Sequence, residues 1–123
     1  MKTKTLTLTL LLATTACTTP PPTKTHIYKP DGNKQCEPAT ASLADSARQL
    51  TNAGIEVHSS HCATQTGMAV ITVCGAPTLG IHLHQINSAD LQEALTLGYE
   101  DASKLSDQSN GTGYEITACP APD

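Results

Sequence analysis

The 123-residue chain contains no tryptophan and no phenylalanine, and its only aromatic residues are three tyrosines. This scarcity argues against a surface that stacks bases or sugar rings on aromatic side chains. Lysine and arginine are also few, because 7 basic residues stand against 11 acidic ones and the net charge is −4. Binding to nucleic acid requires a basic surface, so the sequence predicts no nucleic-acid partner.

Motifs of common enzyme classes are missing as well. The chain has no Gly-x-Ser-x-Gly elbow, no Cys-x-x-Cys pair and no glycine-rich phosphate loop. The sequence therefore predicts a protein that is not an enzyme.

The first 17 residues combine a short basic start with an apolar stretch. Lys2 and Lys4 precede a run from Leu6 to Ala16 that contains only Leu, Thr and Ala. The run is far shorter than the roughly 20 residues of a membrane-spanning helix and has the length of a signal-peptide core. With the Ala16-Cys17 junction, the segment resembles a bacterial lipoprotein signal peptide, although Thr14 replaces the usual Leu three residues before the cysteine.

This resemblance implies cleavage before Cys17 and lipidation of Cys17 by acyl chains such as palmitate. Residues 1–16 would then be the signal peptide, and the proline-rich residues 17–25 would tether a domain to the membrane. Thr18 follows the cysteine in place of the Asp that signals inner-membrane retention. The resemblance therefore favours an outer-membrane anchor, with the domain in the periplasm or at the cell surface. The alternative is a secreted protein cut near Ala16, with Cys17 an unpaired thiol.

The cysteine count supports lipidation, because five cysteines leave one unpaired in an exported chain. A lipid on Cys17 leaves Cys36, Cys62, Cys74 and Cys119 for disulfides, which allow three pairings. A hairpin turn at 64–67 would place Cys62 far from Cys74, beyond the reach of a bond. This geometry favours Cys36–Cys74 together with Cys62–Cys119. The alternative is one reduced pair and a free C-terminal segment.

Residues 26–105 are expected to form one small domain, which disulfides would help to stabilise. Two helices are predicted, starting at the hydroxyl caps of Ser42 and Ser88 and ending at Gly54 and Gly98. Strands are predicted at 26–29, 55–58, 68–74 and 80–86. Residues 68–74 (MAVITVC) are almost wholly apolar, as in a central strand covered on both faces. The polar sequence of residues 106–123, without periodicity, predicts a flexible C-terminal tail.

The predicted order, β-α-β-β-β-α, favours an α+β fold in which a small antiparallel sheet carries both helices on one face. A ferredoxin-like arrangement is one candidate. The run from Cys74 to Tyr99 resembles small proteobacterial lipoproteins of unknown function, and that resemblance implies no activity.

Histidine is the one chemically reactive residue type that clusters in the sequence. His82 and His84 alternate on a predicted strand and so share one face, and His58 and His61 lie on another strand. If the two strands are neighbours, these imidazoles could bind zinc or copper, with the Met68 sulfur favouring copper. The simpler alternative is that the histidines are polar residues on the outer face of an amphipathic strand. No other cofactor is predicted.

The sequence favours a membrane-anchored lipoprotein that acts as a non-enzymatic protein-interaction module with a partner in the cell envelope. Two alternatives stay open: an envelope copper- or zinc-binding protein that uses the four histidines, and a structural accessory subunit of an envelope assembly.

Overall fold

The computed structural model describes residues 12–17, 21–106 and 111–121. Within these ranges the chain forms a five-stranded sheet of order β4-β1-β3-β2-β5, in which each neighbouring pair is antiparallel. The strands are β1 (Lys24–Pro30), β2 (Val57–Gln65), β3 (Gly80–Asn87), β4 (Glu100–Asp101) and β5 (Tyr114–Ile116). The helices are α1 (Leu43–Asn52) and α2 (Leu91–Thr96), with 3₁₀ turns at Ser88–Asp90 and Ala102–Leu105.

Local sequence signals set the ends of α1. The Ser42 hydroxyl accepts a hydrogen bond from the Asp45 N–H at 3.0 Å, which caps the first turn as predicted. Gly54, with φ of 82°, follows the last turn and adopts the left-handed conformation expected there. The end of α2 repeats this arrangement, because Gly98 has φ of 92°. The expected cap at Ser88 differs, since a 3₁₀ turn comes first and α2 begins three residues later.

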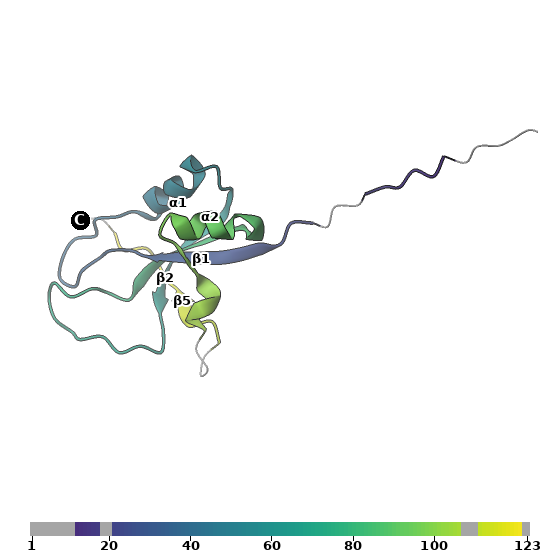
Figure 1. The fold of residues 1–123 in the computed structure, drawn as a ribbon. Helices are drawn as coiled ribbons and strands as arrows, with labels where there is room; N and C mark the ends of the chain where they lie inside the picture. Colours follow the sequence, from purple (N-terminus) through teal and green to yellow (C-terminus); the bar gives the residue numbers. More distant parts are fainter. Residues whose placement is uncertain (1–11, 18–20, 107–110, 122–123) are drawn as a thin grey trace, which may run out of the picture.

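Both helices cover one face of the sheet (Figure 1), which confirms the predicted α+β class. The core on this face consists of residues from the strands, the helices and the segments after them: Ile27, Leu50, Ile55, Ile86, Ala94 and Tyr99. A second cluster on the other face contains Tyr28, Ala63, Ile81, Leu83 and Ala102. The strand order and the two crossover helices are compatible with a ferredoxin-like arrangement, with β5 added at the β2 edge.

The predicted central strand at 68–74 is wrong. These residues lie in an irregular loop between β2 and β3, and Met68, Val70, Ile71 and Val73 are 46–76% exposed. The polar segment 57–65 forms the long strand instead and pairs directly with β3, so no strand position is left beside β3 for the apolar run. The prediction failed because an apolar, β-prone composition specifies a strand only where a partner strand is available.

Of the C-terminal tail predicted at 106–123, residues 107–110 and 122–123 lie outside the described residues, and the described part contains a strand. Residues 114–116 form β5, which pairs with residues 63–65 of β2. Cys119 beyond it is bonded to Cys62. Tertiary pairing and the disulfide hold this segment on the sheet although its composition is polar. The short strand β4 was likewise not predicted.

The two ends of the sheet differ in what they carry. The chain enters at Lys24, where β1 lies opposite Asn87 of β3, and residues 21–23 lead into β1 from outside this end (Figure 1). Residues 31–41 and 66–79 lie at the opposite end, where Pro30 pairs with Ile81 and Thr64 with Gly80. We call the end of the sheet at Lys24 the tether end, and the end with residues 31–41 and 66–79 the distal end. In the part of the chain that the structure describes, no helix has the length and apolar character needed to cross a membrane.

Candidate binding site at the distal end of the sheet

A disulfide and one glutamine hold the loop of residues 66–79 (the apolar loop below). Cys36 is bonded to Cys74, with Cα atoms 5.1 Å apart. Beside it, Gln35 Nε2 donates to the Ile71 carbonyl at 2.8 Å, and Gln35 Oε1 accepts from the Val73 N–H at 3.2 Å. The Gln35 backbone also donates to the Ala76 carbonyl and accepts from the Gly75 N–H, each at 2.9 Å. The loop backbone is thus fixed while its apolar side chains stay exposed.

The apolar loop closes one side of a cavity of about 460 Å³. Aliphatic and other uncharged residues line it: Pro30, Gln65, Met68, Ala69, Val70, Ile71, Ala76, Pro77, Thr78, Leu79 and Gly80. No charged residue occurs between His61 and His82, so the loop and both strand ends beside it are electrically neutral. A cavity of this size and lining suits an apolar side chain of a ligand.

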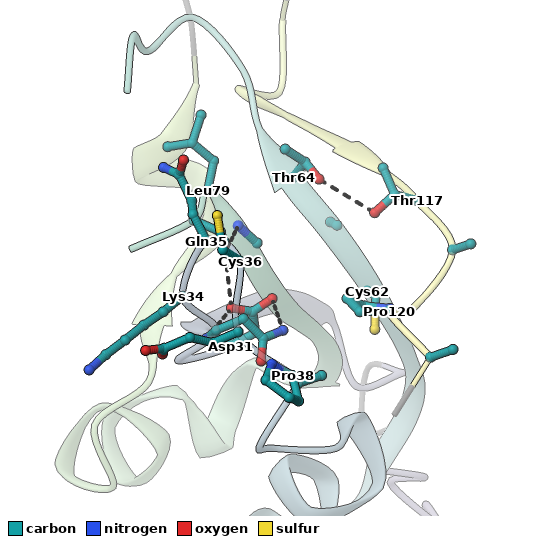
Figure 2. Close-up of a pocket in the computed structure, with 18 residues that line it drawn as sticks. Asp31, Lys34, Gln35, Cys36, Pro38, Cys62, Thr64, Leu79, Thr117 and Pro120 are labelled. Atoms are coloured by element: carbon teal, nitrogen blue, oxygen red, sulfur yellow. Dashed lines mark hydrogen bonds between the residues drawn. The ribbon is translucent and has the colours of Figure 1, made fainter. Parts of the chain in front are cut away.

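A second cavity, of about 530 Å³, lies next to the first, and Thr78, Leu79 and Gly80 line both. Figure 2 shows its walls, formed by the segment from Asp31 to Ala39, the ends of β2 and β3, and the C-terminal segment. The Cys62–Cys119 bond and the hydrogen bond from Thr117 N–H to the Cys62 carbonyl hold that C-terminal wall on β2.

Asp31 is the buried charged residue of this second cavity, with 6% of its surface exposed. Its carboxylate accepts hydrogen bonds from the Asn33 N–H and the Asn33 side-chain amide, both at 2.9 Å, and from the Thr78 hydroxyl at 3.4 Å. A methyl group at Gly80 would lie 2.0 Å from Asp31 Oδ2, so the close packing of Asp31 requires glycine there. Glu37 and Lys34 also line the cavity.

Both disulfides form in the pairing that the sequence favoured, Cys36–Cys74 and Cys62–Cys119. The argument for that pairing was wrong in its geometry, because residues 68–74 form no strand and the predicted hairpin at 64–67 is therefore absent. Cys17 is exposed and lies outside both bonds.

The structure does not bring the four candidate metal ligands together. His82 and His84 share the helix-covered face, where they are buried opposite Cys62 and Ser60 of β2. His61 is opposite Leu83 and so faces the other side of the sheet, while His58 lies at a bulge near the tether end, 2.8 Å from Asn87 Oδ1. Among the described residues, no three His, Cys, Asp or Glu side chains are placed to hold a metal ion.

His84 belongs instead to a buried polar network under α1. Its Nε2 lies 2.8 Å from the Ser46 hydroxyl and its Nδ1 2.7 Å from the Ser60 hydroxyl. Burial, with a smaller contribution from neighbouring His82, lowers the pKa of His84 to about 4. Burial also lowers the pKa of His82, although the Asp31 carboxylate acts in the opposite direction. Both imidazoles are therefore neutral at pH 7, and His84 links α1 to β2 and β3.

Sequence reasoning missed the two residues that organise the distal end. Asp31 belongs to the turn-forming run Pro30-Asp31-Gly32-Asn33, and this pattern does not reveal the Gly80 contact 49 positions later. Gln35 carries no motif at all, and only its place beside Cys36 could have drawn attention to it.

The chain matches no protein-family model, no curated protein and no solved structure.

Proposed function

We propose that this chain is an outer-membrane lipoprotein, anchored through Cys17, whose distal end binds another envelope protein without catalysing a reaction. The observation that carries the proposal is the apolar loop: four aliphatic side chains exposed on a backbone that a disulfide and Gln35 hold in place.

Leaving these side chains in water is unfavourable. Burial of apolar surface contributes roughly 25 cal/mol per Å², and full burial of one aliphatic side chain contributes about 1.5–3 kcal/mol. A mobile loop could turn such side chains inward, but the bonds from Gln35 and Cys36 restrain this one. Fixing a loop before it binds reduces the entropy lost on association, which is the physical advantage of a pre-ordered contact surface.

The position of the loop supports a protein partner over the anchoring membrane. β1 has seven residues, so the loop lies roughly 20 Å of strand away from the point where the tether enters. A lipid on Cys17 would place the tether end nearest the bilayer and direct the loop away from it. The mature chain is acidic, about −6 without Lys2 and Lys4, which also disfavours anionic lipid.

The proposal is tested by site-specific photo-cross-linking in intact envelopes. A photoreactive amino acid replaces Ile71 in the apolar loop or, as the matched control, exposed Thr51 on α1. We expect a discrete heavier adduct from position 71 and none from position 51, with the adduct lost in the C36S/C74S variant. Absence of an adduct at 71 while the domain is folded would refute the proposal.

The membrane anchor needs its own test. Metabolic labelling with an alkynyl fatty acid should label the wild-type chain, and the C17S variant should be unlabelled and appear in the soluble periplasmic fraction. No described contact favours the copper- or zinc-binding alternative, and it is not proposed.

A further inference from the structure

We infer that the partner of the distal end presents a segment in which an apolar side chain and an arginine or lysine lie a few residues apart. The apolar side chain would enter the cavity beside the apolar loop, and the basic one would enter the neighbouring cavity at Asp31 and Glu37. This inference rests on the proposed function and adds the chemistry of the partner.

The two cavities are close enough for one short peptide to occupy both. They flank the same three residues, Thr78 to Gly80, which contribute to both linings. An extended peptide advances about 3.3 Å per residue, so side chains one to five positions apart can enter two cavities that share a wall. The cavities differ in chemistry, because one is neutral and aliphatic and the other contains carboxylates.

The case for a basic side chain begins with Asp31. Asp31 is a buried residue, with 6% of its surface exposed, yet the hydrogen-bond partners of its carboxylate are the neutral groups of Asn33 and Thr78. Neither ion pair found within the described residues includes it. Buried charges in proteins are usually paired, since desolvation of an isolated charge is costly. His82 does not provide the missing cation, because burial lowers its pKa.

Two further carboxylates lie at this end of the sheet, against one lysine. Glu37 lines the polar cavity, and Glu115 of β5 lies opposite Thr64 at the same end of the sheet. Lys34 is the single basic residue in the cavity lining. This acidic rim beside a neutral apolar surface is complementary to a basic segment with an apolar anchor, and the negative net charge of the chain attracts such a segment from a distance. A second copy of this chain carries the same negative charge and would be repelled.

The inference is tested with the full chain, produced with its own signal sequence and purified from envelopes in detergent. The probe is an array of nonapeptides on a Gly/Ser background, with Leu, Ile, Phe or Tyr one to five positions from Arg or Lys. Two matched arrays replace the basic residue with Glu or the apolar residue with Ser. We expect the best apolar–basic peptides to bind at least tenfold more tightly than either matched peptide, with a specific spacing preferred.

Variants assign each half of the peptide to its cavity. Changing Asp31→Asn or Glu37→Gln should weaken binding of the best peptide at least fivefold and reduce its salt dependence. Changing Ile71→Ser should weaken it irrespective of salt. The matched controls are Asp90→Asn at the tether end and Leu97→Ser, an exposed apolar residue after α2, and both should bind as wild type. E37Q keeps the test valid if D31N disturbs the turn.

Three results would overturn the inference: equal binding to the Glu-containing array, unchanged binding by both D31N and E37Q, or occupation of the loop by a second copy or a lipid vesicle. Sedimentation analysis of the chain and of its I71S variant detects the second copy. Flotation with phosphatidylcholine–phosphatidylglycerol vesicles, using C17S to remove the anchor, detects the lipid. If position 71 still forms protein adducts in envelopes while the arrays show no preference, the partner chemistry fails and the interaction function stands.

Discussion

A single buried histidine couples the stability of the domain to pH. His84 has no exposed surface, and its two ring nitrogens are satisfied by the hydroxyls of Ser46 and Ser60. A neutral imidazole has one donor and one acceptor, which two hydroxyl groups can match. Protonation would make both nitrogens donors and bury a charge under α1. Burial of the imidazole, with a smaller contribution from His82, therefore favours the neutral form in the folded state.

We predict that stability falls as the pH is lowered from about 6.5 to 4. The pKa of His84 is about 4 in the folded chain and near 6.5 when unfolded, so the unfolded state binds more protons in this window. The stabilising contribution is complete above the unfolded pKa and decreases as the pH falls towards the folded pKa, by about 3 kcal/mol at most. Urea unfolding at pH 7 and pH 4.5 measures it. The H84Q variant should lose much of this dependence, while His82 retains a smaller part; an H84Q slope equal to wild type would contradict the prediction.

A second residue-scale prediction concerns Gly80. Its missing side chain makes room for the Asp31 carboxylate, so Gly80→Ala should displace Asp31 and weaken its hydrogen bonds to Asn33. We expect a loss of about 1–3 kcal/mol in the free energy of unfolding. In the D31A background the same substitution should cost much less, because the clash is gone, and a double-mutant cycle measures that difference. Additive effects would show that Asp31 and Gly80 do not interact.

At the scale of elements, the apolar loop depends on Gln35. Gln35→Ala removes the two side-chain hydrogen bonds to Ile71 and Val73 but leaves the disulfide and the core unchanged. We predict faster amide hydrogen exchange at Val73 and its neighbours, with the global free energy of unfolding within about 0.5 kcal/mol of wild type. Exchange followed by mass spectrometry tests this, and Gln92→Ala on α2 is the control. Unchanged exchange in the loop would mean that the disulfide alone orders it.

The helices and strands differ in how well the sequence predicted them. Both helices, β1, β3 and the helix-ending glycines were predictable because caps and periodicity are local signals. Residues 68–74 and 114–116 were not, since their state is decided by which strand lies next to β3 and β2. The same holds for the candidate site. Cysteine counting anticipated its disulfides, whereas the roles of Asp31 and Gln35 depend on contacts with residues 36 to 49 positions away.

At the scale of the molecule, the proposed membrane anchor and the proposed contact surface lie at opposite ends of the sheet. The tether enters at one end of the sheet, and the apolar loop and both cavities lie at the other. An exposed aliphatic loop on a lipid-anchored domain could also bind the bilayer directly. The two arrangements differ in which end of β1 lies near the lipid headgroups, and that difference can be measured without knowledge of the partner.

We predict that the tether end, and not the apolar loop, contacts the membrane. With the lipidated chain in nanodiscs that contain headgroup spin-labelled lipid, amide signals of Lys24, Thr25 and Asn87 should be broadened, because these residues lie where the chain enters the fold. Signals of Val70 to Val73 should keep their intensity, since they lie beyond the far end of a strand roughly 20 Å long. The C17S variant, mixed with the same nanodiscs, should show no broadening at either end of the sheet. Strong broadening at 70–73 would instead mean that the apolar loop inserts into lipid. The exposed apolar side chains would then form a second membrane contact, and the loop would no longer support a protein partner for the neighbouring acidic cavity.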